Sequence, residues 1–305
     1  MTSSNTYAKF YLPREIRAKL ALFQYQNDFG TSTVDSFKDL KEQILSGPVE
    51  RRIMNSRRFK VEIPVKHFNE ALCRRHYFGV RRIHRLCRSA ERLANTKWAT
   101  AWTLTTCYYA AFFAALELLH VTGTHVSYFS TEEIEELTTV ALPSKDKLEA
   151  GTYLGVATFN ATSGEIEITY AQSAQKPHDF TWHQMRLLIE QTEGGTEEAS
   201  QHRRTILRLL GADHHCWARP NEIRNRWNYV DATLFSERGE RLGAEMNDGI
   251  VQPRKTFRWG PDKNLHRSEE NETVGIAYLR ATFVDAVEHV AGAVLPQKLA
   301  AKLAN

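Results

Sequence analysis

Apolar residues recur with helical spacing over most of the chain, which predicts a mainly helical protein. From His67 to Leu93 they gather near one side, and pairs of arginines project from the other. The segment from Trp98 to Val121 is apolar on nearly all sides, which is typical of a helix in the middle of a bundle. A capping box, Ser130 to Glu133, predicts the start of a short helix. Further amphipathic helices are predicted at residues 180–191, 199–210, 220–235 and 276–294.

A shorter period marks the β-structure. Phe59, Val61, Ile63 and Val65 alternate with polar residues, which predicts a short half-buried strand at the edge of a sheet. Two such runs flank the turn at residues 160–164, so we expect a β-hairpin inserted between bundle helices. The fold class expected is therefore mainly α (α+β).

The same patterns suggest a domain organisation. We expect an N-terminal α/β extension at residues 1–66 and a helical domain at residues 67–305, with the hairpin at about 152–172. Residues 238–270 are rich in glycine and proline and are expected to form a long loop.

Composition narrows the class of protein. With 305 residues, 42% of them apolar and 25% charged, the chain can bury a large core and is not disordered. The four cysteines, none of them in a CxxC pair, are expected to be reduced thiols. The N-terminus lacks the order of a secretory signal, and the longest apolar stretch is too short to cross a bilayer. We therefore expect a cytoplasmic protein without a membrane span.

Charge changes the picture locally. The formal net charge is only +4, but residues 48–92 hold thirteen basic and four acidic residues. Such segregation creates a field that attracts phosphates. The alternative is a solvated face that pairs with the acidic run at residues 132–136. The candidate RNA-binding residues are Arg74, Arg75, Arg81, Arg82, Arg85 and Arg88.

The most unusual polar segment is residues 223–229. On a continuous helix Arg224 and Asn228 would lie four apart, as would Asn225 and Tyr229, forming neighbouring ridges near the helix N-terminus. An arginine, an amide and a phenol there could hold a phosphodiester and stabilise charge on it. Arg224, Asn225 and Tyr229 are the candidate catalytic residues. The alternative is that Arg224 pairs with an acid while the other two close buried hydrogen bonds.

Two helices resemble those of the HEPN family, a group of helical domains found in prokaryotes and higher eukaryotes. One is the small-residue and aromatic helix with Thr105–Thr106–Cys107–Tyr108–Tyr109–Ala110–Ala111–Phe112–Phe113–Ala114–Ala115. In the other, Arg224 matches the family's motif arginine and Asn225 the polar residue that often follows it. The resemblance implies a HEPN-like helical bundle and a metal-independent RNase whose motif residues meet across a dimer interface.

The chain departs from that motif at one position. The family carries a histidine about four to six residues after the arginine, and here Tyr229 stands near that place. Histidine exchanges protons near neutral pH, whereas tyrosine keeps its proton until about pH 10. The resemblance therefore supports phosphate engagement by Arg224 better than it supports cleavage.

Other motifs point away from metals and cofactors. His214–His215–Cys216 with Asp213 is interpreted as a surface loop, and His120 and His125 as ordinary capping residues near a helix end. The phosphate-loop, dinucleotide-binding, nucleophile-elbow and zincin motifs are all missing from the sequence. No metal and no cofactor are expected.

Two functions remain in view. The first is a HEPN-like protein of a prokaryotic defence, toxin or stress system, acting on RNA as a homodimer. The second is a non-catalytic helical scaffold or interaction subunit of a larger complex, which the missing histidine and the tryptophan content favour.

Overall fold

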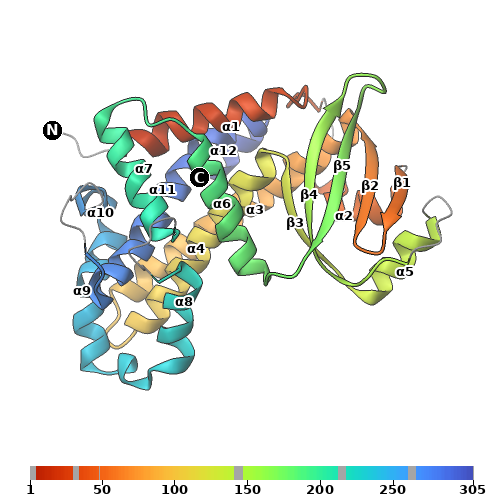
Figure 1. Ribbon diagram of the computed structural model, residues 1–305. Coiled ribbons are helices and arrows are strands. Elements are labelled where there is room, and N and C mark those ends of the chain that lie inside the picture. Colours follow the sequence, from red (N-terminus) through yellow and green to blue (C-terminus); the bar gives the residue numbers. More distant parts are fainter. Residues whose placement is uncertain are drawn as a thin grey trace. The chain divides into compact units, whose positions relative to one another are not determined.

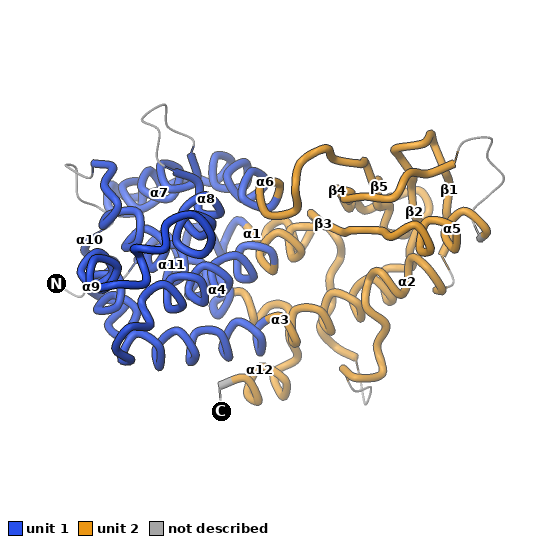
Figure 2. The backbone as a smooth tube through the Cα atoms, turned by 90° about the horizontal axis from the view of Figure 1, so that it is seen from below, with its two compact units in different colours: residues 1–15, 80–116, 181–289 blue, residues 16–79, 117–180, 290–305 orange. Residues whose placement is uncertain are grey.

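The computed structural model describes residues 5–29, 34–47, 49–140, 147–211, 218–259 and 266–304. The chain divides into two compact units, coloured separately in Figure 2. Unit 1 comprises residues 1–15, 80–116 and 181–289, and unit 2 comprises residues 16–79, 117–180 and 290–305. Segments far apart in the sequence therefore build each unit, and the division does not follow the expected boundary after residue 66.

Helices predominate, with one small sheet (Figure 1). The α-helices are α1 (Leu12–Ala21), α2 (Leu40–Ser46), α3 (Val65–Ala94), α4 (Thr100–Val121), α5 (Thr131–Val140), α6 (Pro177–Gln191), α7 (Glu197–Leu209), α8 (Pro220–Asn225), α9 (Glu237–Val251), α10 (Pro253–Trp259), α11 (Glu269–Val294) and α12 (Gln297–Ala304). Short π- or 3₁₀-helical turns are η1 (Tyr7–Tyr11), η2 (Val34–Ser36), η3 (Arg226–Val230) and η4 (Ala232–Phe235). The strands are β1 (Glu50–Asn55), β2 (Arg58–Pro64), β3 (Thr124–Phe129), β4 (Gly151–Asn160) and β5 (Glu165–Ser173). The mainly α (α+β) class is confirmed.

The five strands form one antiparallel sheet in unit 2, in the order β1-β2-β5-β4-β3. The expected hairpin is present as β4 and β5. The expected edge strand is β2, but it is not an edge, because it pairs with β1 on one side and with β5 on the other. The alternation of β2 identifies one buried face and cannot show how many neighbours the strand has.

An aromatic cluster fills the buried face of this sheet. Phe59 stacks on Tyr170 with ring centroids 4.7 Å apart, and Phe129 and Tyr153 meet Phe59 edge-on. All four side chains are fully buried. Because the cluster draws on β2, β3, β4 and β5, it fixes the register of the sheet.

The two strongest predicted helices are confirmed as α3 and α4. The capping box at the start of α5 is also present, since the Ser130 N–H donates to Glu133 Oε2 at 2.8 Å. The expectation that no apolar stretch is long enough to cross a bilayer is wrong by length and composition, because α4 is long and apolar enough, yet 78% of its apolar window is buried inside the protein. That burial is characteristic of the core helix of a soluble protein.

The expectation of a long loop at residues 238–270 is wrong for the part of this range that the structure describes. α9 and α10 occupy most of that range, and α11 begins at Glu269. The glycines that suggested a loop serve close packing: a Cβ at Gly239 would collide with the Leu234 carbonyl oxygen, and one at Gly243 with the Thr100 side chain. Composition alone cannot separate this use of glycine from a turn.

The single helix expected at residues 220–235 is divided. Pro220 occupies the first turn of α8, as expected, but α8 ends at Asn225 and passes into the π-helical turn η3. The Asp231 N–H donates to the Arg226 carbonyl at 3.1 Å, closing the wider turn. The spacing on which the two predicted ridges rested is therefore lost.

Candidate nucleic-acid interface

Arg224 lies in the last turn of α8, within unit 1. The expectation that it stands near a helix N-terminus, where a dipole would favour an anion, is wrong because α8 has only six residues. The side chain is 9% exposed. Arg224 is therefore nearly enclosed, and its surroundings decide what it can do.

Those surroundings are tyrosine rings. The guanidinium carbon lies 5.2 Å from the ring centre of Tyr108, 5.6 Å from that of Tyr109 and 5.9 Å from that of Tyr229. Each distance falls within the range of a cation–π contact. Among the described residues, no carboxylate forms an ion pair with Arg224, so its positive charge is not neutralised there.

Tyr108 is held in place from two sides. Trp182 Nε1 donates to its hydroxyl at 3.2 Å, and Arg224 also hydrogen-bonds to it. Burial raises the pKa of the Tyr108 phenol to about 12, although these two hydrogen bonds oppose the shift. The phenol therefore stays protonated at neutral pH and cannot act as a general base.

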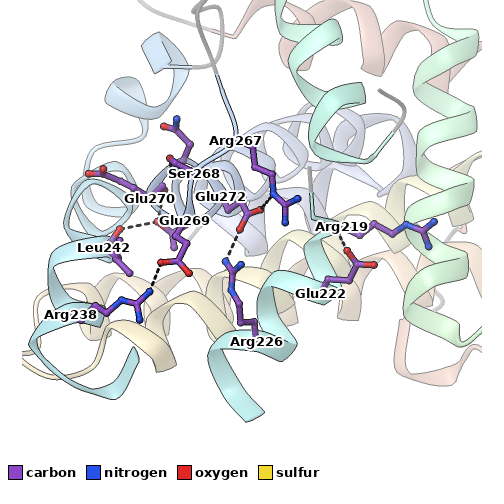
Figure 3. Close-up of polar contacts among 12 residues, drawn as sticks. Arg219, Glu222, Arg226, Arg238, Leu242, Arg267, Ser268, Glu269, Glu270 and Glu272 are labelled. Atoms are coloured by element: carbon purple, nitrogen blue, oxygen red, sulfur yellow. Dashed lines mark hydrogen bonds and ion pairs between the residues drawn. The ribbon is translucent and has the colours of Figure 1, made fainter. Parts of the chain in front are cut away.

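Arg226, in contrast, lies beside a buried carboxylate, as Figure 3 shows. Its Nη2 lies 2.6 Å from Oε2 of Glu272, which is 1% exposed, and Arg267 Nε lies 2.8 Å from the other oxygen of the same carboxylate. The sequence analysis offered an arginine–acid pair as the alternative role for Arg224. Such a pair exists in this segment, but Arg226 forms it. It fastens η3 to α11 and leaves Arg224 without such a partner.

The other two predicted catalytic residues are exposed. Tyr229 is 72% exposed and contacts Arg224 only through its ring. Asn225 is also exposed, and no described contact joins it to Arg224 or Tyr229. Asn228 accepts a hydrogen bond from Thr105 Oγ1 at 3.3 Å, which ties η3 to α4. The structure thus brings Arg224 and Tyr229 together and leaves Asn225 apart.

The Tyr109 ring that contacts Arg224 belongs to a row of aromatic rings on α4. Tyr109 stacks on Phe113 with centroids 6.1 Å apart, and the Arg82 guanidinium carbon lies 3.7 Å from the centre of the Phe113 ring. Trp102, whose ring is exposed, lies on the same face of α4, seven residues before Tyr109. We call this set the aromatic–arginine surface: Arg82, Trp102, Tyr109, Phe113, Arg224 and Tyr229.

This surface joins two predicted sites that the sequence kept separate. Sequence reasoning assigned the apolar side chains of α4 to the core, whereas Tyr109 and Phe113 are only half-buried and Trp102 is 54% exposed. The signal that could have found them is the spacing of Trp102, Thr106, Tyr109 and Phe113, which follows one helical face.

The six predicted RNA-binding arginines divide between the units. Arg74 donates to the Val34 and Asp35 carbonyls at 3.3 and 2.9 Å, and Arg75 Nε donates to His120 Nδ1 at 2.6 Å. Both are half-buried in unit 2 and serve its structure. The other four are exposed in unit 1: Arg81, Arg82, Arg85 and Arg88.

Three of these belong to a longer line on α3. Arg81, Arg85, Arg88 and Arg92 are all exposed and follow one face at intervals of four, three and four residues, and we call them the basic stripe. Within the described part of the chain, no carboxylate pairs with Arg85, Arg88 or Arg92. Like charges at this spacing repel one another, which is the state expected of a surface that meets an anionic partner.

Several basic residues of unit 2 make structural contacts. Arg51 is buried and donates from Nε to the Ile44 carbonyl in the last turn of α2 and from Nη2 to the Gly47 carbonyl just after it at 2.8 Å, so it caps the end of α2. Lys60 pairs with Glu167 at 2.9 Å across two strands. Basic residues on the sheet therefore stabilise the fold, and the stripe on α3 is the part left for a partner.

The histidines expected to cap a helix have another role. His125 lies on β3, is 2% exposed and stacks on His120 with ring centroids 5.5 Å apart. Burial, helped by nearby Arg75, lowers the pKa of His125 to about 3. A neutral buried ring cannot serve as the capping cation, so that expectation is wrong for His125.

Three of the four cysteines lie within the described residues. Within the described ranges, no group of three or more possible protein ligands is placed to hold a metal ion. Cys73, Cys87 and Cys107 are free and buried. The loop with Asp213, His214, His215 and Cys216 lies outside the described residues.

Comparison with known proteins found no matching family model, no matching curated protein and no matching solved structure.

Proposed function

We propose that unit 1 binds single-stranded RNA on the aromatic–arginine surface and the adjoining basic stripe, as a HEPN-like RNA-binding relative. The exposed rings of Trp102 and Tyr229 offer planes on which bases stack, and arginines supply the charge that attracts the backbone. The rings and the arginines both occur in unit 1. Arg82 links them, because it lies on α3 and its guanidinium covers the Phe113 ring of α4.

One observation carries the proposal. Arg224 keeps an unneutralised charge beneath the rings of Tyr109 and Tyr229, while Arg226, two residues away, is neutralised by Glu272. Burying a guanidinium without a carboxylate partner costs free energy, which a functional role for the positive charge would explain. Attraction of a polyanion to the surface above is such a role.

Binding is favoured over cleavage by the same contacts. The described ring and hydrogen-bonding partners of Arg224 include no imidazole, and Tyr108 keeps its proton. A metal-independent RNase needs a group that exchanges protons near neutral pH. The proposal also includes the setting that the HEPN resemblance implies. In that setting the protein is a cytoplasmic homodimer of a defence, toxin or stress system.

A second candidate is an interaction subunit without RNA. Trp102 meets Phe235 at 5.9 Å, and Phe235 and Val230 are 43% and 76% exposed. Exposed aromatic residues are enriched where proteins meet, so this part of the surface also suits a protein partner or a second copy of the chain.

The test compares Arg224→Met with Arg226→Met as a matched control. Each variant removes one guanidinium from the same short segment, but only Arg224 lacks a carboxylate. With labelled single-stranded RNA in EDTA, we expect affinity to fall by about tenfold in Arg224→Met and by less than about threefold in Arg226→Met.

The same samples separate the other candidates. RNA cleavage that survives EDTA and disappears in Arg224→Met would establish an RNase in place of a binding protein. Absence of RNA binding, with a wild-type mass in solution that is twice the 35.0 kDa of the chain and becomes monomeric in Trp102→Ala, would establish an interface between copies.

A further inference from the structure

The sheet of unit 2 has two edges, which differ in how well they are protected. β1 lies at one end of the strand order and β3 at the other, so each of them has one hydrogen-bonded neighbour (Figure 1). An edge strand presents backbone N–H and C=O groups that can pair with another strand, and proteins blunt such edges with charged side chains, bulges or proline.

β1 carries this kind of protection. Its exposed side chains include Glu50 and Arg52, and its register with β2 shifts between Ile53 and Asn55. Charge and an irregular backbone both oppose the addition of a further strand at this edge.

β3 carries no such protection. Its sequence, THVSYF, contains no acidic residue, lysine, arginine or proline, and all six residues pair with β4 without a shift in register. Its histidine, His125, is buried. Within the part of the chain that the structure describes, the backbone of β3 hydrogen-bonds to no segment other than β4. β3 is therefore an open edge.

The face of β3 that points away from the aromatic cluster is uncharged and partly exposed. It presents Thr124, Val126 and Tyr128, and it continues onto β4, where Val156 lies opposite Thr124. The Tyr128 side chain is 58% exposed and that of Val156 is 46% exposed. β4 also lacks charged residues over its whole length, GTYLGVATFN. A strand that adds to this edge should therefore be uncharged and apolar as well.

A second copy of β3 meets that requirement. Antiparallel pairing about a two-fold axis at Val126 sets this residue opposite its own copy and Thr124 opposite Tyr128 of the other copy. These pairs share one face of the joined sheet, and pairs of β-branched and aromatic residues are favourable across strands. Pairing of β3 with β1 of another copy would instead bring Glu50 and Arg52 to an uncharged edge and leave further edges open.

We propose that two copies of the chain form a two-fold homodimer through β3, with the strands antiparallel about Val126 and the two sheets joined into one. This interface lies in unit 2, whereas the HEPN resemblance implies an interface at the motif residues of unit 1. The inference rests on the sheet and does not depend on RNA binding.

The first test measures the mass of the full chain by analytical ultracentrifugation over a range of concentrations. We expect the wild type to approach twice 35.0 kDa. Val126→Lys and Val126→Glu should each weaken dimerisation by at least about tenfold, because like charges then meet at the axis. An equimolar mixture of the two variants should restore the dimer, because lysine then faces glutamate. Met54→Lys is the matched control on β1, where Met54 is 49% exposed, and should keep the wild-type mass.

Crosslinking keeps the test decisive if a charge at position 126 disturbs the fold. Val126→Cys removes little volume, and a short bis-maleimide should join two copies of this variant, because directly opposite residues have Cβ atoms about 5 Å apart. Met54→Cys and the wild type should give only the background of the native cysteines.

Three results would overturn the proposal. The first is a wild type that stays monomeric at every concentration, which would leave the β3 edge to an extended peptide of another protein. The second is a dimer that the folded Val126→Lys variant leaves intact. The third is a dimer that Trp102→Ala dissociates while Val126→Cys gives no crosslink, which would place the interface in unit 1. RNA binding is tested separately by Arg224→Met, so each proposal can fail without the other.

Discussion

Arg224 and Arg226 stand two residues apart and have opposite partners. Arg226 shares the buried carboxylate of Glu272 with Arg267, while Arg224 rests among tyrosine rings. The sequence shows two arginines on one short segment and cannot tell which of them faces an acid that lies 46 residues further on. The change from α8 to the π-helical turn η3 decides this.

Glu272 should show strong coupling between its two arginines. When either is replaced, the other still neutralises the carboxylate, so Arg226→Met and Arg267→Met are each expected to cost about 1 kcal/mol of unfolding free energy. The double variant leaves a buried charge unpaired and should cost about 1–3 kcal/mol more than the sum. Urea denaturation measures the cycle, and additivity within about 0.5 kcal/mol would contradict this account of the site.

Two histidines in unit 2 should make the fold sensitive to acid. Burial lowers the pKa of His76 to about 4 and that of His125 to about 3, and both rings lack a described hydrogen-bond partner. The unfolded chain takes up protons near pH 6.5, before the folded protein does, so stability falls as the pH drops below that value. Each histidine should remove about 2 kcal/mol by pH 5.

The measurement is urea denaturation at pH 7 and pH 5 for the wild type, His76→Phe and His125→Phe. Each phenylalanine removes one ionising ring and should reduce the pH dependence. An unchanged difference between the two pH values in both variants would show that other groups cause the acid sensitivity.

Among the elements, α9 shows why a correct residue pattern can predict the wrong structure. Its glycines are typical of a loop in sequence, yet the helix uses Gly239 and Gly243 to approach Leu234 and Thr100 closely. Thr100 belongs to α4, which is distant from α9 in the sequence. Local composition therefore could not predict this helix.

Substitution of Gly239 tests this use of glycine. Alanine favours a helix by up to about 1 kcal/mol, but a Cβ at Gly239 would strike the Leu234 carbonyl oxygen, so Gly239→Ala should lower stability by about 1–3 kcal/mol. Gly292 in α11 has nothing within 4 Å of such a Cβ, so Gly292→Ala should raise stability by about 0.5–1 kcal/mol. Thermal unfolding of both variants provides the comparison, and a stabilising Gly239→Ala would refute the packing.

What the sequence could predict follows from periodicity. α3, α4 and the hairpin of β4 and β5 carry long, regular patterns and were predicted. β1 and β3 were not, because their place in the sheet depends on partners distant in sequence. The same holds for the candidate site: Arg224 was chosen correctly as unusual, but its tyrosine contacts arise from the packing of α8 on α4.

At the scale of the whole molecule, the small net charge does not show how the basic residues are distributed between the two units. The chain carries only +4, and the basic residues of unit 2 largely support its own fold through Arg51, Arg75 and Lys60. The exposed arginines of α3 belong to unit 1, as do the exposed ring of Trp102 and the half-buried rings of Tyr109 and Phe113 on α4. The RNA-binding proposal is therefore a claim about one unit.

The salt dependence of RNA affinity tests that claim most directly. Fluorescence anisotropy of a short labelled single-stranded RNA, titrated at several salt concentrations, gives the slope of log affinity against log salt for the wild type and for the combined Arg85→Gln, Arg88→Gln and Arg92→Gln variant. Each phosphate contact contributes about 0.7 to the slope, so the variant should lose about 2 from its magnitude. An equal slope in both proteins, or no RNA binding by the wild type at low salt, would contradict the account.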